Sequence, residues 1–212
     1  MKDIVTEIIE DKSRVGVRIN EEKVYWLSYA DYRERPLLPN DFVDLAEYEE
    51  WLLPRHYAQA LNKAVAFLAV RSRSRQEVEQ KLQSKGYLDR AVELALYKLE
   101  KEKLLDDEAF AREWAQARSH RHLGKVRILQ ELRQKGISRT IAEKACADLP
   151  REEQETQAVT LARKLLRRYA TQENETKAVQ KIIAAMGRRG FSYEEASRAF
   201  QTALRQAKED DE

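Results

Sequence analysis

The sequence predicts a mainly α-helical protein in which tandem three-helix repeats follow a small N-terminal module of β-strands and one helix. Strand-forming residues are concentrated before residue 30, and no strand pattern recurs after Tyr57. A helix-ending glycine occurs three times in similar surroundings, at Gly86, Gly136 and Gly190, with spacings of 50 and 54 residues. Together these features indicate the fold class and its repeated unit.

The surroundings of the three glycines share one pattern. The residue eight positions before is β-branched and apolar, the residue four before is apolar, the residue one before is basic, and the residue after is large and apolar or Tyr. Residues four apart lie on one face of a helix, so the first two positions predict a buried stripe. Glycine ends a helix in the left-handed conformation, and the residue after it packs back onto the helix. These positions are Val78, Leu82, Lys85 and Tyr87, then Ile128, Leu132, Lys135 and Ile137, then Ile182, Met186, Arg189 and Phe191.

Residues 1–55 are predicted to form the N-terminal module. The segments IVTEIIE, VGVRI and KVYWLSY are rich in Val, Ile and aromatic residues, and the short breaks between them predict three antiparallel strands in two hairpins. Residues 31–40 hold two prolines and are expected to be a loop. Asp41 is then expected to cap a helix that runs to about Leu53 and is ended by Pro54.

From Tyr57 onward the periodicity predicts nine helices in three sets, over residues 56–104, 105–150 and 151–208, with an acidic tail at 209–212. Ser74 with Glu77, and Ser192 with Glu195, are predicted capping boxes. One three-helix unit cannot bury a full core alone, so we expect the repeats to stack into an elongated, curved array. The expected helices are 57–71, 75–85, 88–102, 107–121, 125–135, 139–148 (capped by Ser138), 151–169, 175–189 and 193–208.

Composition favours a soluble protein with an uneven charge distribution. Of the 212 residues 36% are charged, and no apolar run approaches the ~20 residues that a membrane span needs. Residues 1–56 carry 8 Lys and Arg against 13 Asp and Glu, residues 57–150 carry 19 against 13, and residues 151–212 carry 12 against 11. The middle segment suits an acidic surface or a polyanion, but it is weakly basic for a protein that binds DNA by itself. We expect a cytoplasmic monomer in which the single Cys146 is a small core residue.

No catalytic, cofactor-binding or metal-binding residues are predicted, and the protein is not expected to be an enzyme. The sequence holds no HExxH, phosphate-loop or dinucleotide-binding motif. His120 and His122 are two residues apart, which places them on different faces of a helix. These two histidines and His56 are interpreted as solvated polar residues near helix ends.

Basic residues are the candidate binding residues, because they crowd the link between the first and second helices in two of the three sets. For any one of them a solvated helix face is an equally good interpretation in so charged a chain. Phosphate contacts require only positioned cations, so a contact with DNA in a nucleoprotein complex is an option. The candidates are Arg71, Arg73, Arg75, Lys81, Lys85, Arg118, Arg121, Lys125, Arg127, Lys135, Arg167, Arg168, Arg188 and Arg189.

Three segments resemble the signatures of the RecX family. FLAVRSRSRQEVEQKLQSKGY resembles its first signature, KLLDDEAFAREWAQAR its second and GKVRILQELRQKGIS its third, in the family's order. The resemblance covers residues 57–208, although AAMGRRGF departs from the usual Leu and Lys of the third repeat.

The resemblance implies a non-catalytic regulator that binds RecA and the RecA–single-stranded DNA filament. Such a protein modulates the ATPase, strand exchange and SOS co-protease activity of RecA, and we expect it to inhibit them. At most weak contact with DNA and no contact with a membrane are expected. The alternative is a helical protein that binds DNA directly, such as a transcription regulator. Against it, the predicted third helix of the first set, LDRAVELALYKLEKEK, is apolar and acidic where a recognition helix is basic.

Overall fold

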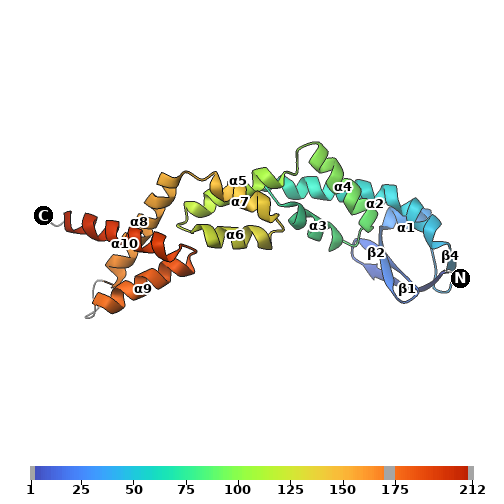
Figure 1. Ribbon diagram of the computed structural model, residues 1–212. Coiled ribbons are helices and arrows are strands. Elements are labelled where there is room, and N and C mark those ends of the chain that lie inside the picture. Colours follow the sequence, from blue (N-terminus) through green and yellow to red (C-terminus); the bar gives the residue numbers. More distant parts are fainter. Residues whose placement is uncertain (1–2, 170–174, 210–212) are drawn as a thin grey trace. The chain divides into compact units, whose positions relative to one another are not determined.

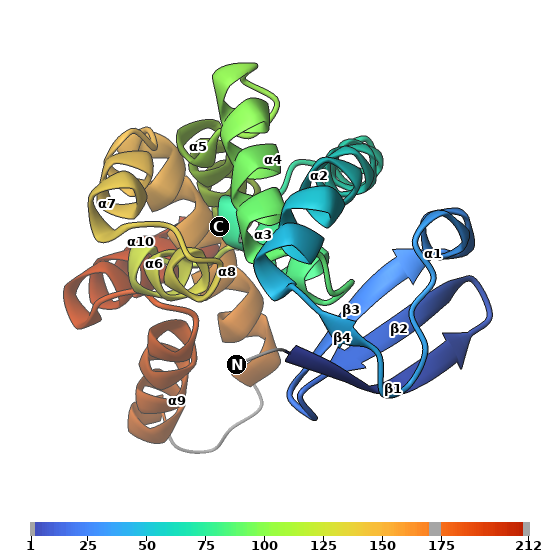
Figure 2. The same cartoon turned by 90° about the vertical axis from the view of Figure 1, so that its right-hand side faces the viewer.

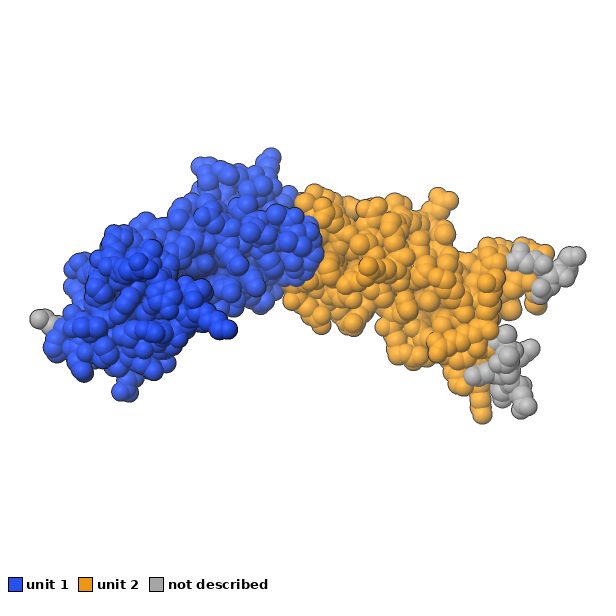
Figure 3. All heavy atoms as spheres, turned by 180° about the vertical axis from the view of Figure 1, so that it is seen from behind, with its two compact units in different colours: residues 1–106 blue, residues 107–212 orange. Residues whose placement is uncertain are grey.

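The structure, a computed structural model, describes residues 3–169 and 175–209. It is mostly helical, with a four-stranded sheet at the N-terminus (Figure 1), which confirms the predicted fold class. The chain divides into two compact units, residues 1–106 and 107–212 (Figure 3). The finer division into one module and three repeats as separate domains stays a prediction.

The sheet is antiparallel and has the order β3-β2-β1-β4. Its first three strands and two hairpins are those predicted. The fourth strand was not predicted, because two residues are too few to show an alternating pattern; it pairs with the start of β1, with Ile4 opposite Phe42. The strands are β1 (Asp3–Asp11), β2 (Arg14–Ile19), β3 (Lys23–Ser28) and β4 (Phe42–Val43).

Two helix predictions in the module are wrong. A short helix, α1 (Tyr29–Glu34), occupies the start of the expected loop, and Ser28 caps it by accepting from the Asp31 N–H. Asp41 does not cap a helix. Its carboxylate accepts from the Leu38 N–H at 2.7 Å, which closes a turn in the loop, and Asp44 is the N-cap of the next helix.

That next helix, α2 (Leu45–Leu68), runs through Pro54, so the predicted end at this proline is also wrong. A proline inside a helix removes one backbone hydrogen bond and costs ~3 kcal/mol. Here Pro54 is exposed, while the face made by Tyr48, Leu52, His56, Ala60 and Ala64 is buried without a break. Burial of this continuous face outweighs the local cost. The first part of α2 therefore packs on the sheet and the second part belongs to the first repeat (Figure 2).

Of the nine helices expected after Tyr57, the last eight are present in the described residues with ends within a few residues of the prediction, and the first is the C-terminal part of α2. The first repeat combines α2 with α3 (Arg75–Gln83) and α4 (Asp89–Lys101). The second contains α5 (Asp107–Ser119), α6 (Lys125–Gln134) and α7 (Arg139–Ala147). The third contains α8 (Arg151–Tyr169), α9 (Glu175–Arg188) and α10 (Tyr193–Glu209).

Each repeat has its own core, and the predicted stripe residues are at its centre. The residues eight and four before each glycine are all at most 1% exposed. Gly86, Gly136 and Gly190 have φ angles of 78°, 78° and 93°, as a left-handed helix stop requires. Cys146 lies in the core of the second repeat. Both predicted capping boxes and the Ser138 cap are confirmed.

Candidate partner-binding surface

The glycine stop of the first repeat is where the N-terminal sheet packs. Arg14 of β2 donates from Nη1 to the carbonyl of Lys85 at 2.8 Å, and its guanidinium carbon lies 3.8 Å from the centre of the Trp26 ring. The Trp26 ring fills the space beside Gly86, where an added Cβ would lie 2.4 Å from Cδ1 of the tryptophan. Gly86 therefore serves both the left-handed conformation and this close approach.

His56 of α2 links β3 to Leu88, two residues after this glycine stop. Its Nδ1 accepts from the backbone N–H of Leu88 at 3.0 Å, so Nε2 carries the proton and donates to the carbonyl of Trp26 at 2.8 Å. Burial lowers the pKa of His56, which favours the neutral ring. The interpretation of His56 as a solvated residue is wrong, because it lies on the buried face of α2 and both ring nitrogens are satisfied there.

The glycine stop of the third repeat is bonded to the second repeat through the main chain. The carbonyl of Arg189 accepts from the Gly124 N–H at 2.8 Å, and the carbonyl of Gly190 accepts from the Val126 N–H at 3.2 Å. The C-terminal end of α9 thus satisfies backbone donors at the N-terminal end of α6. The Arg189 side chain adds a hydrogen bond to the carbonyl of Arg121, so two predicted binding residues are brought together here.

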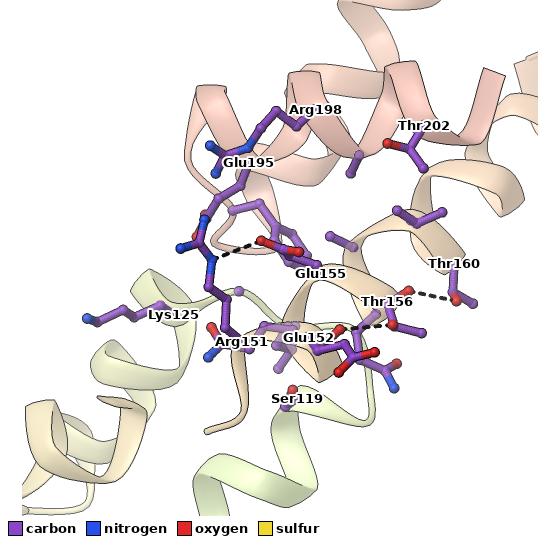
Figure 4. A pocket seen from close by; sticks show the side chains of 18 of the residues that line it. Ser119, Lys125, Arg151, Glu152, Glu155, Thr156, Thr160, Glu195, Arg198 and Thr202 are labelled. Atoms are coloured by element: carbon purple, nitrogen blue, oxygen red, sulfur yellow. Dashed lines mark hydrogen bonds and ion pairs between the residues drawn. The ribbon is translucent and has the colours of Figure 1, made fainter. Parts of the chain in front are cut away.

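A cavity of about 600 Å³ lies between the second and third repeats (Figure 4). Its apolar lining includes Leu123, Ile128 and Phe191, and Lys125 and Arg198 are among its charged lining residues. No local sequence pattern predicts this cavity, because it arises where two separate cores meet.

Arg75 is held by three carboxylates. Its guanidinium lies 3.2 Å from Glu79, 2.8 Å from Glu93 and 2.9 Å from Glu100, which ties α3 to α4. Arg71 pairs with Glu77 at 3.0 Å. The side chain of Arg75 therefore has a structural role in the first repeat.

Arg73 and Lys81 both lie within 6 Å of the centre of the Phe67 ring. The guanidinium carbon of Arg73 lies 4.1 Å from the centre of the Phe67 ring, and Nζ of Lys81 lies 5.6 Å from it. Neither cation has a hydrogen bond or ion pair within the described residues, and Nε of Arg73 is enclosed. Burial and the nearby Arg71 charge lower the pKa of Arg73, and the carboxylate of Glu77 partly opposes them.

The second repeat holds a similar cluster around Trp114. The guanidinium carbon of Arg118 lies 4.2 Å, and Nζ of Lys135 4.3 Å, from the centre of the indole ring. Here a carboxylate is present as well. Glu131 lies 2.7 Å from Nε of Arg118 and accepts from Nε1 of Trp114 at 3.2 Å, and Arg127 lies 3.6 Å from it.

The remaining candidates are spread over the surface of the repeats. Lys85 lies at the end of α3, and Lys125 opens α6 beside the cavity. Arg167 and Arg168 are exposed in the last turn of α8, and Arg121, Arg188 and Arg189 are exposed near the junction of α6 with α9. Sequence reasoning found these cations but did not predict the aromatic rings beside them, Phe67 and Trp114.

Within the described residues, no three His, Cys, Asp or Glu side chains are grouped as metal ligands. Among the same residues, no helix has both the length and the apolar character to cross a membrane.

Comparison with known proteins identifies the repeats. Residues 60–99, 106–145 and 152–200 match the family models for the first, second and third three-helix domains of RecX. The chain belongs to the RecX family. It is similar to "Regulatory protein RecX" of Mycolicibacterium smegmatis, with 34% identity over 74% of this chain and 87% of the relative. It is also 41% identical to "Regulatory protein RecX" of Prosthecochloris aestuarii, over 41% of this chain and 58% of the relative.

Solved RecX structures share the fold. RecX from Lactobacillus salivarius superimposes with a TM-score of 0.66 at 28% identity, over 71% of this chain and 98% of that one. A second regulatory protein RecX has a TM-score of 0.65 at 24% identity and spans 95% of this chain, which bears on the fold alone. Membership of RecX supports a regulatory role.

Proposed function

We propose that this member of the RecX family is a non-catalytic regulator that binds the RecA–single-stranded DNA filament and inhibits RecA. The observation that carries the proposal is the run of three RecX three-helix domains in the family's order. Each repeat has its own core and offers cations at its surface, so the chain can make several separate contacts with neighbouring protomers of a filament. Contacts that differ between filament states would shift the equilibrium between them.

The direct test is the DNA-dependent ATPase of the cognate RecA with this protein added below equimolar amounts. We expect the ATPase and strand exchange to fall, because one regulator can affect several protomers of a filament. RecA-dependent self-cleavage of an SOS repressor should fall in parallel. If none of these activities nor filament length changes over a range of ratios, the proposal is wrong.

Titration into labelled DNA without RecA separates this function from direct DNA binding. A filament regulator should bind bare DNA weakly. Tight, sequence-selective binding with a steep dependence on salt would instead indicate a DNA-binding regulator.

A further inference from the structure

The loop between α1 and β4 presents two large apolar side chains to solvent. Leu38 is 63% exposed and Phe42 is 67% exposed. Phe42 is the only exposed one of the five phenylalanines, all of which lie in the described part of the chain. Single exposed apolar residues are common on protein surfaces, but two at positions 38 and 42 of one ordered loop indicate a contact surface.

The residues beside them explain why these two side chains are exposed. Leu37 and Val43 pack against the core that the sheet shares with α2. Successive residues of a strand face opposite sides of the sheet, so the burial of Val43 leaves Phe42 on the open side. The exposure of Leu38 and Phe42 therefore results from a fixed arrangement of the loop.

Hydrogen bonds hold the backbone of this loop. The Asp41 carboxylate accepts from the Leu38 N–H at 2.7 Å, and the Leu38 carbonyl accepts from the Asp41 N–H at 3.0 Å. Val5 of β1 donates its N–H to the carbonyl of Asp41 at 2.9 Å, and its carbonyl accepts from the Asn40 N–H at 2.8 Å. Leu38 and Phe42 are thus held on a preorganised turn, which loses little conformational entropy when a partner binds.

Three carboxylates near the loop have no cation beside them within the described residues. Asp41 and Asp44 flank Phe42 in the chain, and Asp3 lies opposite Val43 in the β1–β4 pair. The hydrogen bonds that these carboxylates accept come from neutral N–H groups. Their negative charge is therefore left to act on whatever approaches Leu38 and Phe42.

The charge of this region decides the class of partner. No Lys or Arg occurs between Arg35 and Arg55, and residues 1–56 carry 8 Lys and Arg against 13 Asp and Glu. Like charges repel, so the loop disfavours the phosphates of a nucleic acid and the same loop of a second copy. Exposed apolar side chains among carboxylates are complementary to an apolar pocket with Lys or Arg at its rim.

We propose that Leu38 and Phe42 form a docking surface that inserts into such a pocket on a partner protein. The surface rests on the proposed function in that the partner is a protomer of the RecA filament. It gives the N-terminal module a contact of its own, which is apolar and acidic, whereas the candidate residues of the repeats are cations.

The first experiment measures affinity for the RecA filament on single-stranded DNA. Leu38→Ala and Phe42→Ala should each weaken binding about tenfold, because large side chains at the centre of a contact carry much of its affinity. Phe42→Leu is the matched control, since it keeps an apolar side chain at this position and should retain most of the affinity. Thermal unfolding checks that the variants are folded, and Leu38→Ala gives a second reading if Phe42→Ala is not.

A second pair of variants tests the charge of the partner's pocket. Asp44→Asn keeps a side chain that caps α2 but removes the negative charge, so it should weaken binding and reduce its dependence on salt. Glu10→Gln removes one charge at the other end of β1 and should bind normally. If Asp44→Asn binds as Glu10→Gln does, the basic rim is wrong.

Cross-linking identifies what covers the surface. Benzoylphenylalanine in place of Phe42 should cross-link to RecA in the filament under ultraviolet light, and the same group in place of Tyr29, in α1, should do so far less. A cross-link to DNA or to a second copy of this chain would overturn the proposal.

The outcomes separate this surface from the proposed function. If the unmodified protein binds the filament and both alanine variants bind equally well, the surface is wrong and the function stands. If the unmodified protein does not bind the filament, the proposed function is wrong and the assignment of RecA to this surface is wrong with it.

Discussion

The glycine stops of the first and third repeats receive different neighbours at the same position. In both, the carbonyl of the residue before the glycine accepts a hydrogen bond at 2.8 Å, at Lys85 and at Arg189. The donor is the side chain of Arg14 in the first case and the backbone N–H of Gly124 in the second. The same helix stop therefore contacts a β-sheet in the first repeat and another repeat in the third.

The two positions differ in what an added side chain would meet. A Cβ at Gly86 would collide with the Trp26 side chain, whereas a Cβ at Gly190 would collide with the backbone of Arg127. A side chain can move by rotation, but the backbone at the start of α6 can move only by breaking its hydrogen bonds. We therefore expect substitution of Gly190 to destabilise the protein more than substitution of Gly86.

The largest effect is expected for Gly190→Ala. Its Cβ would lie 2.4 Å from the backbone nitrogen of Arg127, at a φ of 93°. Strain and clash together should lower the free energy of unfolding by about 3 kcal/mol or more, measured by urea denaturation. Gly187→Ala, in the last turn of α9, is the control, because its Cβ would meet no atom within 4 Å, and it should be neutral or slightly stabilising. If the two variants change the free energy of unfolding equally, close packing of Gly190 against Arg127 does not explain the requirement for glycine.

Gly86→Ala should cost less, about 2 kcal/mol, part of it from the left-handed conformation and part from Trp26. In a Trp26→Ala background the cost should fall to about 1 kcal/mol, since only the backbone strain remains. A double-mutant cycle by chemical denaturation measures the difference. If the cost is the same in both backgrounds, the tryptophan does not set the requirement for glycine.

Acid should lower the free energy of unfolding through His56, which lies where the N-terminal sheet packs on the first repeat. Because burial lowers the pKa of the folded histidine below its ordinary 6.5, the unfolded chain binds the proton first as the pH falls. The free energy of unfolding should therefore be constant above that value and decline below it. His56→Gln should lack this part of the decline when unfolding is compared between pH 8 and pH 5.5. An identical pH profile in the two proteins would contradict this role.

The smallest effect is expected for Arg14→Ala, which removes the hydrogen bond to Lys85 and the stacking on Trp26. One such hydrogen bond contributes about 1 kcal/mol. Arg33→Ala, at an exposed position in α1, should be neutral by the same thermal or urea measurement. If Arg14→Ala lowers the free energy of unfolding no more than Arg33→Ala does, then Arg14 contributes nothing and Trp26 alone holds the sheet against Gly86.

The candidate surface could be predicted only in part. The sequence located the cations, because charge is read directly from residue type. It could not distinguish Arg75, which forms ion pairs with three carboxylates, from Arg73, whose enclosed Nε has no hydrogen-bond partner within the described residues. That distinction depends on Glu93 and Glu100 of α4, residues that are remote in the sequence and are brought near only by packing.

The sequence by itself determined the repeat: the helices, their caps and the three glycine stops, because capping and a buried stripe depend on residues within a few positions of each other. Only the tertiary structure decided how α2 continues through Pro54, why His56 is buried, and what each glycine stop receives. Those outcomes depend on the continuous burial of one helix face and on neighbours between 30 and 71 residues away in the chain, which no local pattern encodes.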